Sequence, residues 1–222
     1  MITAERKPLS EIKESIAPYK KVLIVGCGSC VAECASGGEK EVALLASALR
    51  MDAKKEKREL ELLEMTLDRQ CVFEFIDQLT ELIDEYDAVL SLGCGAGVQA
   101  VAEVFPRAHL IPALNTTFLG QTKESGLWLE NCRGCGDCKL AYFAAVCPVT
   151  RCAKGLFNGP CGGSKNGNCE VDPETPCAWA LIVTRLEEGG RLDTLATIHP
   201  PAQWSRQQGK GPRKIVREDQ RI

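Results

Sequence analysis

The sequence predicts an α/β fold, a small doubly wound parallel sheet with cluster loops at the strand C-terminal ends, followed by an irregular cysteine-rich metal-binding module. Short apolar runs alternate with helical periodicity through the first half of the chain, which is the pattern of a parallel sheet covered by helices. Eight of the thirteen cysteines then lie between Cys132 and Cys177. We expect an α/β domain at 1–127, a cysteine-rich module at 128–190 and a basic extended tail at 191–222.

The elements of the first domain follow from periodicity. The continuous apolar run at 22–25 predicts a buried strand. Apolar residues at i, i+3, i+4 and i+7 from Val42 to Leu49 predict an amphipathic helix that starts after Gly38 and ends in the charged run 54–58. The same criteria predict, in order, a strand at 60–65, a helix at 72–83, a strand at 88–92, a helix at 98–105 and a short strand at 109–111.

Composition and charge exclude several classes of function. The chain has 222 residues, of which 45% are hydrophobic and 26% charged, a globular balance. A net charge of -3 does not indicate a basic surface that would bind nucleic acid or anionic lipid. No apolar stretch is long enough to span a bilayer. The polar N-terminus without a secretory signal predicts a cytoplasmic protein, in which disulfides are disfavoured.

Cysteines follow three of the predicted strands, at the sheet edge where α/β proteins bind ligands. Cys27, Cys30 and Cys34 form a C-x2-C-x3-C loop after the first strand, Cys71 follows the second and Cys94 follows the third. Three thiolates from the loop and one from a neighbouring strand end suit an iron–sulfur cluster. We expect Cys94 as the fourth ligand because its Gly-Cys-Gly context matches that of Cys27, with Cys71 as the alternative.

Other interpretations of the first cysteine loop remain open. A dinucleotide fingerprint requires a third glycine where this chain has Val31. A redox pair of Cys27 and Cys30 would make the protein a thiol–disulfide oxidoreductase, but it leaves the other three cysteines without a role. Buried, inert cysteines are the remaining alternative.

The cysteine-rich module contains two further groups of possible ligands. Cys132, Cys135 and Cys138, followed by Cys147 before a proline, resemble the ferredoxin run C-x2-C-x2-C with a later Cys-Pro. The fourth ligand of this group is Cys147, with Cys152 as the alternative.

The last group has wide spacings that do not identify its metal. Four thiolates suit either zinc or an iron–sulfur cube, and we expect iron–sulfur. Little hydrophobic core can form here, so bound metal would organise the module. The two histidines, His109 and His199, are distant in sequence, so we expect sites made only of thiolates. The group comprises Cys152, Cys161, Cys169 and Cys177.

Three other features are assigned structural roles. The glycine-rich run 162–167 lacks the order of a phosphate-binding loop. Residues 179–186 predict a closing helix that ends at Gly189. The basic stretch from Pro200 through Arg206, Lys210 and Arg221 predicts a solvated arm, with docking on an acidic partner as the alternative.

Several motifs carry a resemblance to a known family. They are the Gly26-to-Cys30 loop, the Leu92-to-Gln99 segment, the run from Cys132 to Cys138, the Cys152-to-Gly163 segment with its Asn-Gly-Pro-Cys-Gly-Gly sequence, and Cys177-Ala178-Trp179. Over residues 20–190 the chain resembles the small iron–sulfur and zinc-binding subunit of bacterial methylenetetrahydrofolate reductases. That subunit is itself related to the cysteine-rich C-terminal domain of such reductases.

The resemblance implies an electron-transfer subunit of a cytoplasmic oxidoreductase complex. Its partner would be a flavin-containing catalytic subunit that reduces methylene-tetrahydrofolate to methyl-tetrahydrofolate, as in the methyl branch of the reductive acetyl-CoA pathway. Ferredoxin or another redox subunit would donate electrons to two or three [4Fe-4S] clusters, and some family members carry zinc in one tetrad. We expect neither nucleic acid nor membrane insertion.

The residues agree with a subunit that is not itself catalytic. The sequence offers no convincing acid–base pair, no Ser-His-Asp set and no complete nucleotide fingerprint. A zinc-organised structural subunit that positions its partner is the main alternative to the electron-transfer subunit, and the thiol–disulfide oxidoreductase is a third possibility.

Overall fold

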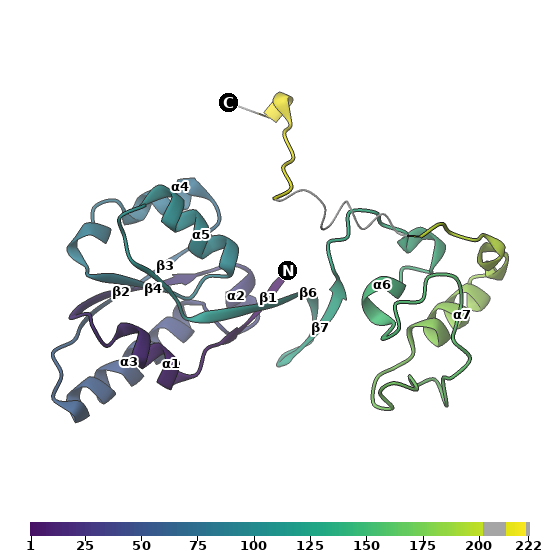
Figure 1. Ribbon diagram of the computed structural model, residues 1–222, viewed down its shortest axis with the longest axis horizontal. Coiled ribbons are helices and arrows are strands. Elements are labelled where there is room, and N and C mark those ends of the chain that lie inside the picture. The colour runs from purple at the N-terminus through teal and green to yellow at the C-terminus, as the bar shows by residue number, and fades with distance from the viewer. Residues whose placement is uncertain (202–211, 221–222) are drawn as a thin grey trace. The chain divides into compact units, whose positions relative to one another are not determined.

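The computed structural model describes residues 1–201 and 212–220, so Arg206, Lys210 and Arg221 of the predicted tail lie outside the described residues. The chain forms two compact units, Met1–Leu129 and Glu130–Ile222 (Figure 1). The strands are β1 (Ile2–Arg6), β2 (Lys21–Cys27), β3 (Glu61–Leu67), β4 (Ala88–Ser91), β5 (Leu110–Pro112), β6 (Leu114–Glu124) and β7 (Leu127–Cys132). The α-helices are α1 (Leu9–Ile16), α2 (Cys30–Glu33), α3 (Glu39–Glu56), α4 (Phe73–Ile76), α5 (Gly95–Val104), α6 (Pro148–Arg151) and α7 (Ala178–Glu188).

The first unit is built on a parallel four-stranded sheet with the order β3-β2-β4-β5. All four strands predicted from the sequence are present. The segments that connect them contain helices, as predicted for an α/β fold. The parallel sheet of the predicted fold class is therefore confirmed, and the carboxyl ends of β2, β3 and β4 lie at one edge.

Helices cover both faces of this sheet, as a doubly wound fold requires. In β2, Val22 and Ile24 pack with the buried side chains of α1 and α3, whereas Leu23 and Val25 pack with those of α4 and α5. Figure 1 shows α1 and α3 on one side of the sheet and α4 and α5 on the other. Side chains alternate along a strand, and both faces of β2 are buried because each has its own helix layer.

The longest helix, α3, begins and ends with recognisable capping signals. The backbone N–H of Gly38 donates to a carboxylate oxygen of Glu41 at 3.1 Å, which satisfies an amide at the first turn. Lys57 adopts a left-handed conformation with φ 56° just after the last helical residue, a common way to stop a helix.

The prediction of one continuous helix at 72–83 is wrong. The structure has α4, then a 3₁₀ turn η1 (Asp77–Leu79) and a second turn η2 (Ile83–Glu85). Ile76, Leu79 and Ile83 are nevertheless buried against the sheet. The spacing of apolar residues determines which side chains reach the core, but a series of short turns can bury the same side chains as one helix. Asp77 and Thr80 favour turns because their side chains can bond to the nearby backbone.

A second sheet was not predicted. It is antiparallel with the order β1-β6-β7, and β1 pairs with β6 from Ile2 opposite Leu119 to Arg6 opposite Leu114. The strand β6 is largely polar and exposed, so it carries no apolar run that marks a strand. The Ser125-Gly126 pair between β6 and β7 was the sequence signal that could have indicated this hairpin. In the structure Gly126 has φ 87°, which a glycine adopts without strain. Helices α1 and α2 were also not predicted.

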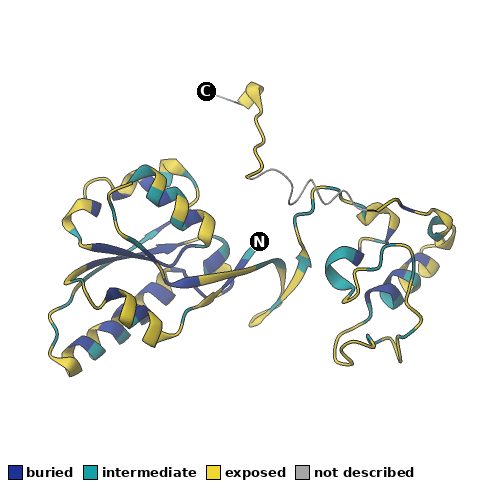
Figure 2. Cartoon of the chain, viewed as in Figure 1, coloured by how far each residue is buried: buried dark blue, intermediate teal, exposed yellow. Residues whose placement is uncertain are grey.

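The second unit has little regular structure. Its helices are α6 and α7 with short 3₁₀ turns η3 (Leu140–Tyr142), η4 (Leu192–Ala196) and η5 (Glu218–Gln220). Its core consists of Phe143, Val146, Ala178, Trp179, Ile182 and Leu186, and Figure 2 shows that burial concentrates on α7. The predicted closing helix is confirmed as α7, with Gly189 as its C-cap.

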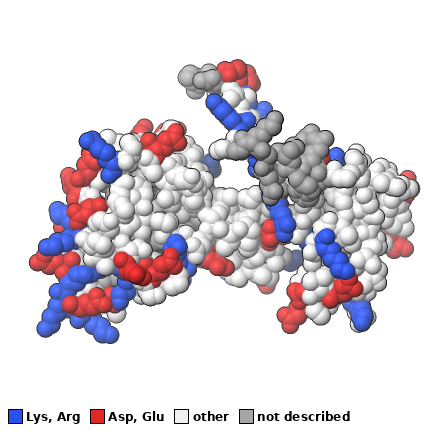
Figure 3. Space-filling model, viewed as in Figure 1, with Lys and Arg blue, Asp and Glu red and all other residues white. Residues whose placement is uncertain are grey.

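The surface carries charges of both signs. On the face shown in Figure 3, Lys and Arg alternate with Asp and Glu over the first unit. Among the helices of the described ranges, none is both long and apolar enough to cross a membrane.

Candidate metal centres

All thirteen cysteines lie in the described part of the chain, and none forms a disulfide. Within 1–201 and 212–220, no three His, Cys, Asp or Glu side chains already converge in the arrangement of a metal site. The thiols instead gather in groups at the edge of the parallel sheet and around two cavities. Free thiols in groups of this kind have the donor chemistry that iron–sulfur clusters and zinc require.

The first group lies at the carboxyl edge of the parallel sheet. Cys27 is the last residue of β2 and is buried. The N–H of Gly28 donates to the carbonyl of Leu67, the last residue of β3, at 2.8 Å. The Cys27 sulfur lies 3.9 Å from the carbonyl oxygen of Asp68. The loop after β2 is therefore held against the end of β3.

Gln70 ties the ends of two strands together. Its side-chain amide donates to the carbonyls of Val25 and Gly26 at 2.8 and 2.9 Å. The hydroxyl of Ser91 at the end of β4 donates to the Gln70 amide oxygen at 2.6 Å. Gln70 is almost completely buried, so this amide is a fixed bridge between β2 and β4.

The loop after β4 approaches Gln70 closely because it contains glycines. A Cβ atom on Gly93 would lie 2.5 Å from the Gln70 amide oxygen, and one on Gly97 would lie 2.8 Å from the Gln70 Cβ. Neither distance leaves room for a side chain. The glycines around Cys94 were visible in the sequence, but nothing there linked them to Gln70, which sequence reasoning missed.

Burial and nearby groups change the pKa of the Cys27 thiol. Burial raises the pKa of the Cys27 thiol, the backbone N–H groups of Gln70 and Ser29 oppose this rise, and the thiols of Cys71 and Cys94 raise the pKa further. The loops that follow β2, β3 and β4 all lie at the carboxyl edge of the parallel sheet, and each of them carries a cysteine.

Two of the predicted ligands precede helices. Cys94 is the residue before α5, and Cys30 is the first residue of α2. The N–H of Gly95 donates to the hydroxyl of Thr116 at 2.8 Å, which anchors the start of α5 to β6.

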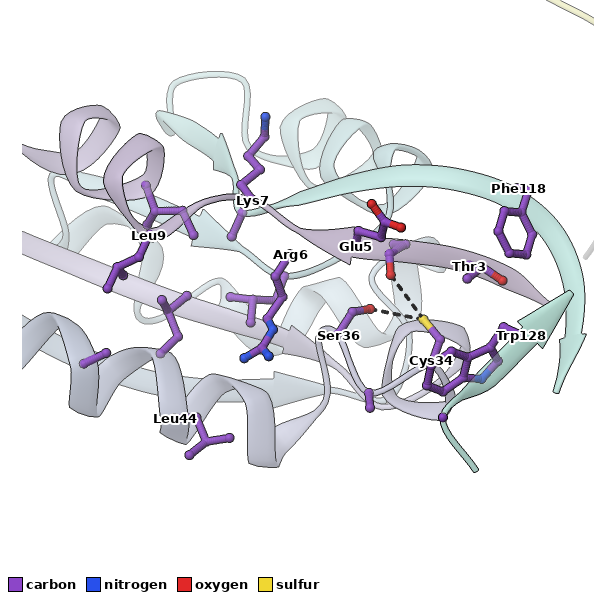
Figure 4. A pocket seen from close by; sticks show the side chains of 18 of the residues that line it. Thr3, Glu5, Arg6, Lys7, Leu9, Cys34, Ser36, Leu44, Phe118 and Trp128 are labelled. Carbon is purple, nitrogen blue, oxygen red and sulfur yellow. Dashed lines mark hydrogen bonds between the residues drawn. The ribbon is translucent and has the colours of Figure 1, made fainter. Parts of the chain in front are cut away.

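Cys34 contacts a different set of groups. Its sulfur lies 3.1 Å from the hydroxyl of Ser36 and 3.7 Å from the carbonyl oxygens of Ala4 and Val31. Cys34 and Ser36 line a cavity of about 790 Å³, together with Trp128. Figure 4 shows the sulfur beneath β1, between Ser36 and Trp128.

The second group surrounds one cavity in the second unit. Cys132, Cys135, Cys138 and Cys147 line a space of about 340 Å³, whereas Cys152 lines another. Leu140, Val149 and Phe157 complete the apolar part of the wall. Cys147, and not its alternative Cys152, therefore lies with the other three cysteines of the ferredoxin-like run.

Glycines shape the loop that carries this group. Gly134 and Gly136 have φ of 60° and 82°, in the left-handed region that glycine adopts without strain. The N–H of Gly134 donates to the sulfur of Cys132 at 3.3 Å. Hydrogen bonds of this kind adjust the reduction potential of a cluster held by such sulfurs.

The third group surrounds a much smaller cavity. Cys152, Cys161, Cys169 and Cys177 line a space of about 20 Å³. The wall also includes the ion pair of Lys154 and Glu170. Cys177 precedes α7, and its N–H donates to the carbonyl of Gly167 at 2.8 Å. A volume of this size accepts about one water-sized occupant.

His199 belongs to the core of the second unit, although the sequence separates it from the cysteine groups. Asn158 donates to the His199 carbonyl at 2.9 Å and accepts from the His199 N–H at 2.8 Å. The imidazole packs against Tyr142, Phe143 and Phe157. Its Nε2 is buried and has no hydrogen-bond partner among the described residues. No local signal connects Asn158 to a residue this far along the chain.

A comparison with known protein families finds a match within the second half of the chain. Residues 111–205 match the model of a family described as methylene-tetrahydrofolate reductase C terminal. The matched range contains the second and third cysteine groups, whereas Cys27, Cys30, Cys34, Cys71 and Cys94 lie outside it. No curated protein matches the chain. The second half is therefore related to the C-terminal part of methylenetetrahydrofolate reductases, which are oxidoreductases of one-carbon metabolism.

Proposed function

We propose that this chain is the electron-transfer subunit of a methylenetetrahydrofolate reductase complex. It receives electrons from ferredoxin or another redox subunit in the cytoplasm and passes them to the flavin of a catalytic partner, which reduces methylene-tetrahydrofolate to methyl-tetrahydrofolate. The observation that carries this proposal is the set of eight cysteines within the matched range 111–205, which line two cavities in sets of four.

The second cysteine group suits a [4Fe-4S] cluster. Four thiolates are the usual ligands of such a cluster, which when bound supplies a one-electron carrier. The cavity of about 340 Å³ has room for a polynuclear group. Leu140, Val149 and Phe157 give the cavity an apolar side, and the polarity around a cluster is one of the ways in which a protein adjusts its potential.

The third cysteine group suits a single zinc ion better than a cluster. Its four thiolates are the donors of a structural zinc site, and its cavity of about 20 Å³ holds little more than one water-sized particle. Zinc there would fix the segment before α7 and stabilise a unit with few buried apolar residues. This assignment replaces the iron–sulfur expectation for Cys152, Cys161, Cys169 and Cys177.

The first cysteine group suits a second [4Fe-4S] cluster. Loops from three neighbouring parallel strands supply its thiols, since Cys27 is the last residue of β2, Cys71 follows β3 and Cys94 lies between β4 and α5. A thiol–disulfide oxidoreductase of Cys27 and Cys30 would give Cys71 and Cys94 no role. We therefore favour metal binding here.

The proposal assigns substrate chemistry to the partner. The sequence offers thiolate ligands and no acid–base pair, so the chain would hold and shield the electron carriers while the flavin subunit binds the folate. The zinc-organised structural subunit remains the competing function, because zinc in all three groups would satisfy the same donors.

Anaerobic spectroscopy of the full chain with its partner tests the proposal. We expect a broad visible absorption that bleaches with dithionite and returns when methylene-tetrahydrofolate is added. A colourless protein that contains only zinc would contradict electron transfer and favour the structural subunit. A Cys27→Ser variant that loses thiol exchange but keeps all of its iron would favour the oxidoreductase.

A further inference from the structure

We infer that the cavity beneath β1 is a binding site for a small amphipathic anion, a molecule with an apolar body and one carboxylate or sulfonate group. The cavity has a volume of about 790 Å³, within the range of about 300–1,000 Å³ that is usual for small-molecule sites. All of its lining residues belong to the first unit. The inference does not depend on metal binding by the chain, since no part of it uses a cysteine as a ligand.

The walls of the cavity are largely apolar. Helix α1 contributes Leu9, helix α3 contributes Leu44 and the start of β7 contributes Leu127. These three leucines are 42%, 53% and 40% exposed. A single exposed leucine is common at a protein surface, but several around one cavity mark a place where an apolar group binds. We therefore assign the apolar body of the ligand to the part of the cavity that these leucines border.

Two buried polar atoms in the same walls have no partner. The hydroxyl oxygen of Thr3 and the indole nitrogen of Trp128 are buried and form no hydrogen bond with a described residue. Thr3 as a whole is only 5% exposed. A buried donor without a partner destabilises the fold, and the hydrogen of a hydroxyl can rotate toward an acceptor. A ligand with hydrogen-bond acceptors would satisfy these donors.

Arg6 supplies a positive charge in the cavity wall. It is exposed, and no described residue forms an ion pair with it, whereas its neighbour Lys7 is paired with Glu11. Glu5 also lines the cavity, but adjacent residues of a strand point to opposite faces. Figure 4 shows the Glu5 carboxylate and the Arg6 guanidinium on opposite sides of β1. The free cation in this cavity therefore favours an anionic ligand.

The position of Arg6 suits a ligand that is anionic and apolar at once. Figure 4 shows Arg6 between Leu9 and Leu44 at one end of the cavity and Trp128 at the other. A guanidinium binds a carboxylate through two parallel hydrogen bonds, which fix the orientation of the bound group. An anionic group held at Arg6 has apolar side chains on both sides, so the rest of the ligand remains in contact with apolar walls.

Titration of the full chain with two matched dyes tests the site. Anilinonaphthalene sulfonate is an aromatic monoanion, and N-phenylnaphthylamine has the same apolar body without the sulfonate. We expect saturable binding of the anionic dye to the wild-type chain, measured by isothermal titration calorimetry, and weaker binding of the neutral dye, measured by fluorescence. Arg6→Gln should weaken binding of the anionic dye about tenfold and leave binding of the neutral dye unchanged.

Helix α3 provides matched controls for both parts of the site. Ala48 lines the cavity, whereas Ser47 and Arg50 are exposed residues outside its lining. Ala48→Phe places a ring in the cavity and should weaken binding of both dyes about tenfold or more, whereas Ser47→Phe should bind them as the wild type does. Arg50→Gln removes a charge that is paired with Glu64 and should not change the binding of either dye.

The controls also define the results that would overturn the inference. Equal binding of the anionic dye by Arg6→Gln and Arg50→Gln, or an equal loss of both dyes in Arg6→Gln, would show that Arg6 does not hold the anionic group. Binding by Ala48→Phe as strong as by Ser47→Phe would show that the dye binds elsewhere. A wild-type chain that binds no anionic dye would also contradict the site. Far-ultraviolet circular dichroism checks that each variant is folded.

Discussion

Gln70 is the residue on which the geometry of the first cysteine group depends. One buried side-chain amide contacts the ends of β2 and β4, and the glycine loop that carries Cys94 packs against it. The cysteines would supply the chemistry, but this uncharged side chain holds their loops in place. Buried polar groups that are fully hydrogen-bonded specify one arrangement because each alternative leaves a group unpaired.

Replacement of Gln70 should therefore destabilise the first unit. In Gln70→Ala the Gly26 carbonyl and the Ser91 hydroxyl lose a partner in the interior, and we expect the free energy of unfolding to fall by about 3 kcal/mol. Anaerobic urea denaturation followed by circular dichroism measures this change.

Gln99 provides the matched control. It is exposed, and its amide donates to the carbonyl of Gly95 within α5, at 2.8 Å. Gln99→Ala should change the free energy of unfolding by less than about 0.5 kcal/mol. Equal effects of the two substitutions would show that Gln70 does not hold the strand ends together.

At the scale of elements, the start of β2 depends on one carboxylate. A side-chain oxygen of Asp87 accepts hydrogen bonds from the backbone N–H groups of Lys20 and Lys21, both at 2.9 Å. These two bonds lower the pKa of Asp87 below its usual value. The carboxylate thus links the beginnings of β2 and β4, at the edge of the sheet opposite the cysteines.

The lowered pKa predicts how stability depends on pH. Because the folded-state pKa of Asp87 is below its unfolded value of about 3.9, its contribution is present above that value and is lost as the pH falls through the folded pKa. Asp87→Asn should lower stability at neutral pH and flatten the decline in acid. Thermal unfolding of both proteins across this range tests it, and parallel pH profiles would count against the role of Asp87.

The elements that the sequence revealed are those whose signal is local. Apolar runs marked β2, β4 and β5, spaced apolar residues marked β3, and helical periodicity marked α3, α5 and α7. The segment from α4 to η2 shows the limit, because spacing identified Ile76 and Leu79 as buried without deciding whether one helix or several turns carries them. The polar strand β6 exists because β1 pairs with it, and pairing between distant segments leaves no local pattern.

The candidate sites also differ in how much of each could be predicted from local sequence. Ferredoxin-like spacing indicated which cysteines belong to the group of Cys132. The structure has all four of them around one cavity. The surroundings of Cys34 were not predictable, because the carbonyl of Ala4 comes from a strand 30 residues away. The contribution of Gln70 was hidden for the same reason, since its partners are 44 and 45 residues distant.

At the scale of the whole molecule, the two units would bind metal for different reasons. The first unit has an extensive apolar core on both faces of its sheet, so it can fold around its own side chains and add a cluster at one edge. Among its described residues, the second unit has six buried apolar residues in its core cluster, and it contains eight cysteines. Metal binding would there supply stability that the core cannot.

The most direct test of electron transfer by this chain is its content of inorganic sulfide. Zinc sites contain none, whereas each [4Fe-4S] cluster contains as much sulfide as iron. For the chain purified anaerobically with its partner, we predict about eight iron and about eight sulfide atoms with about one zinc ion per chain. A chain that contains stoichiometric zinc and no sulfide would contradict the account.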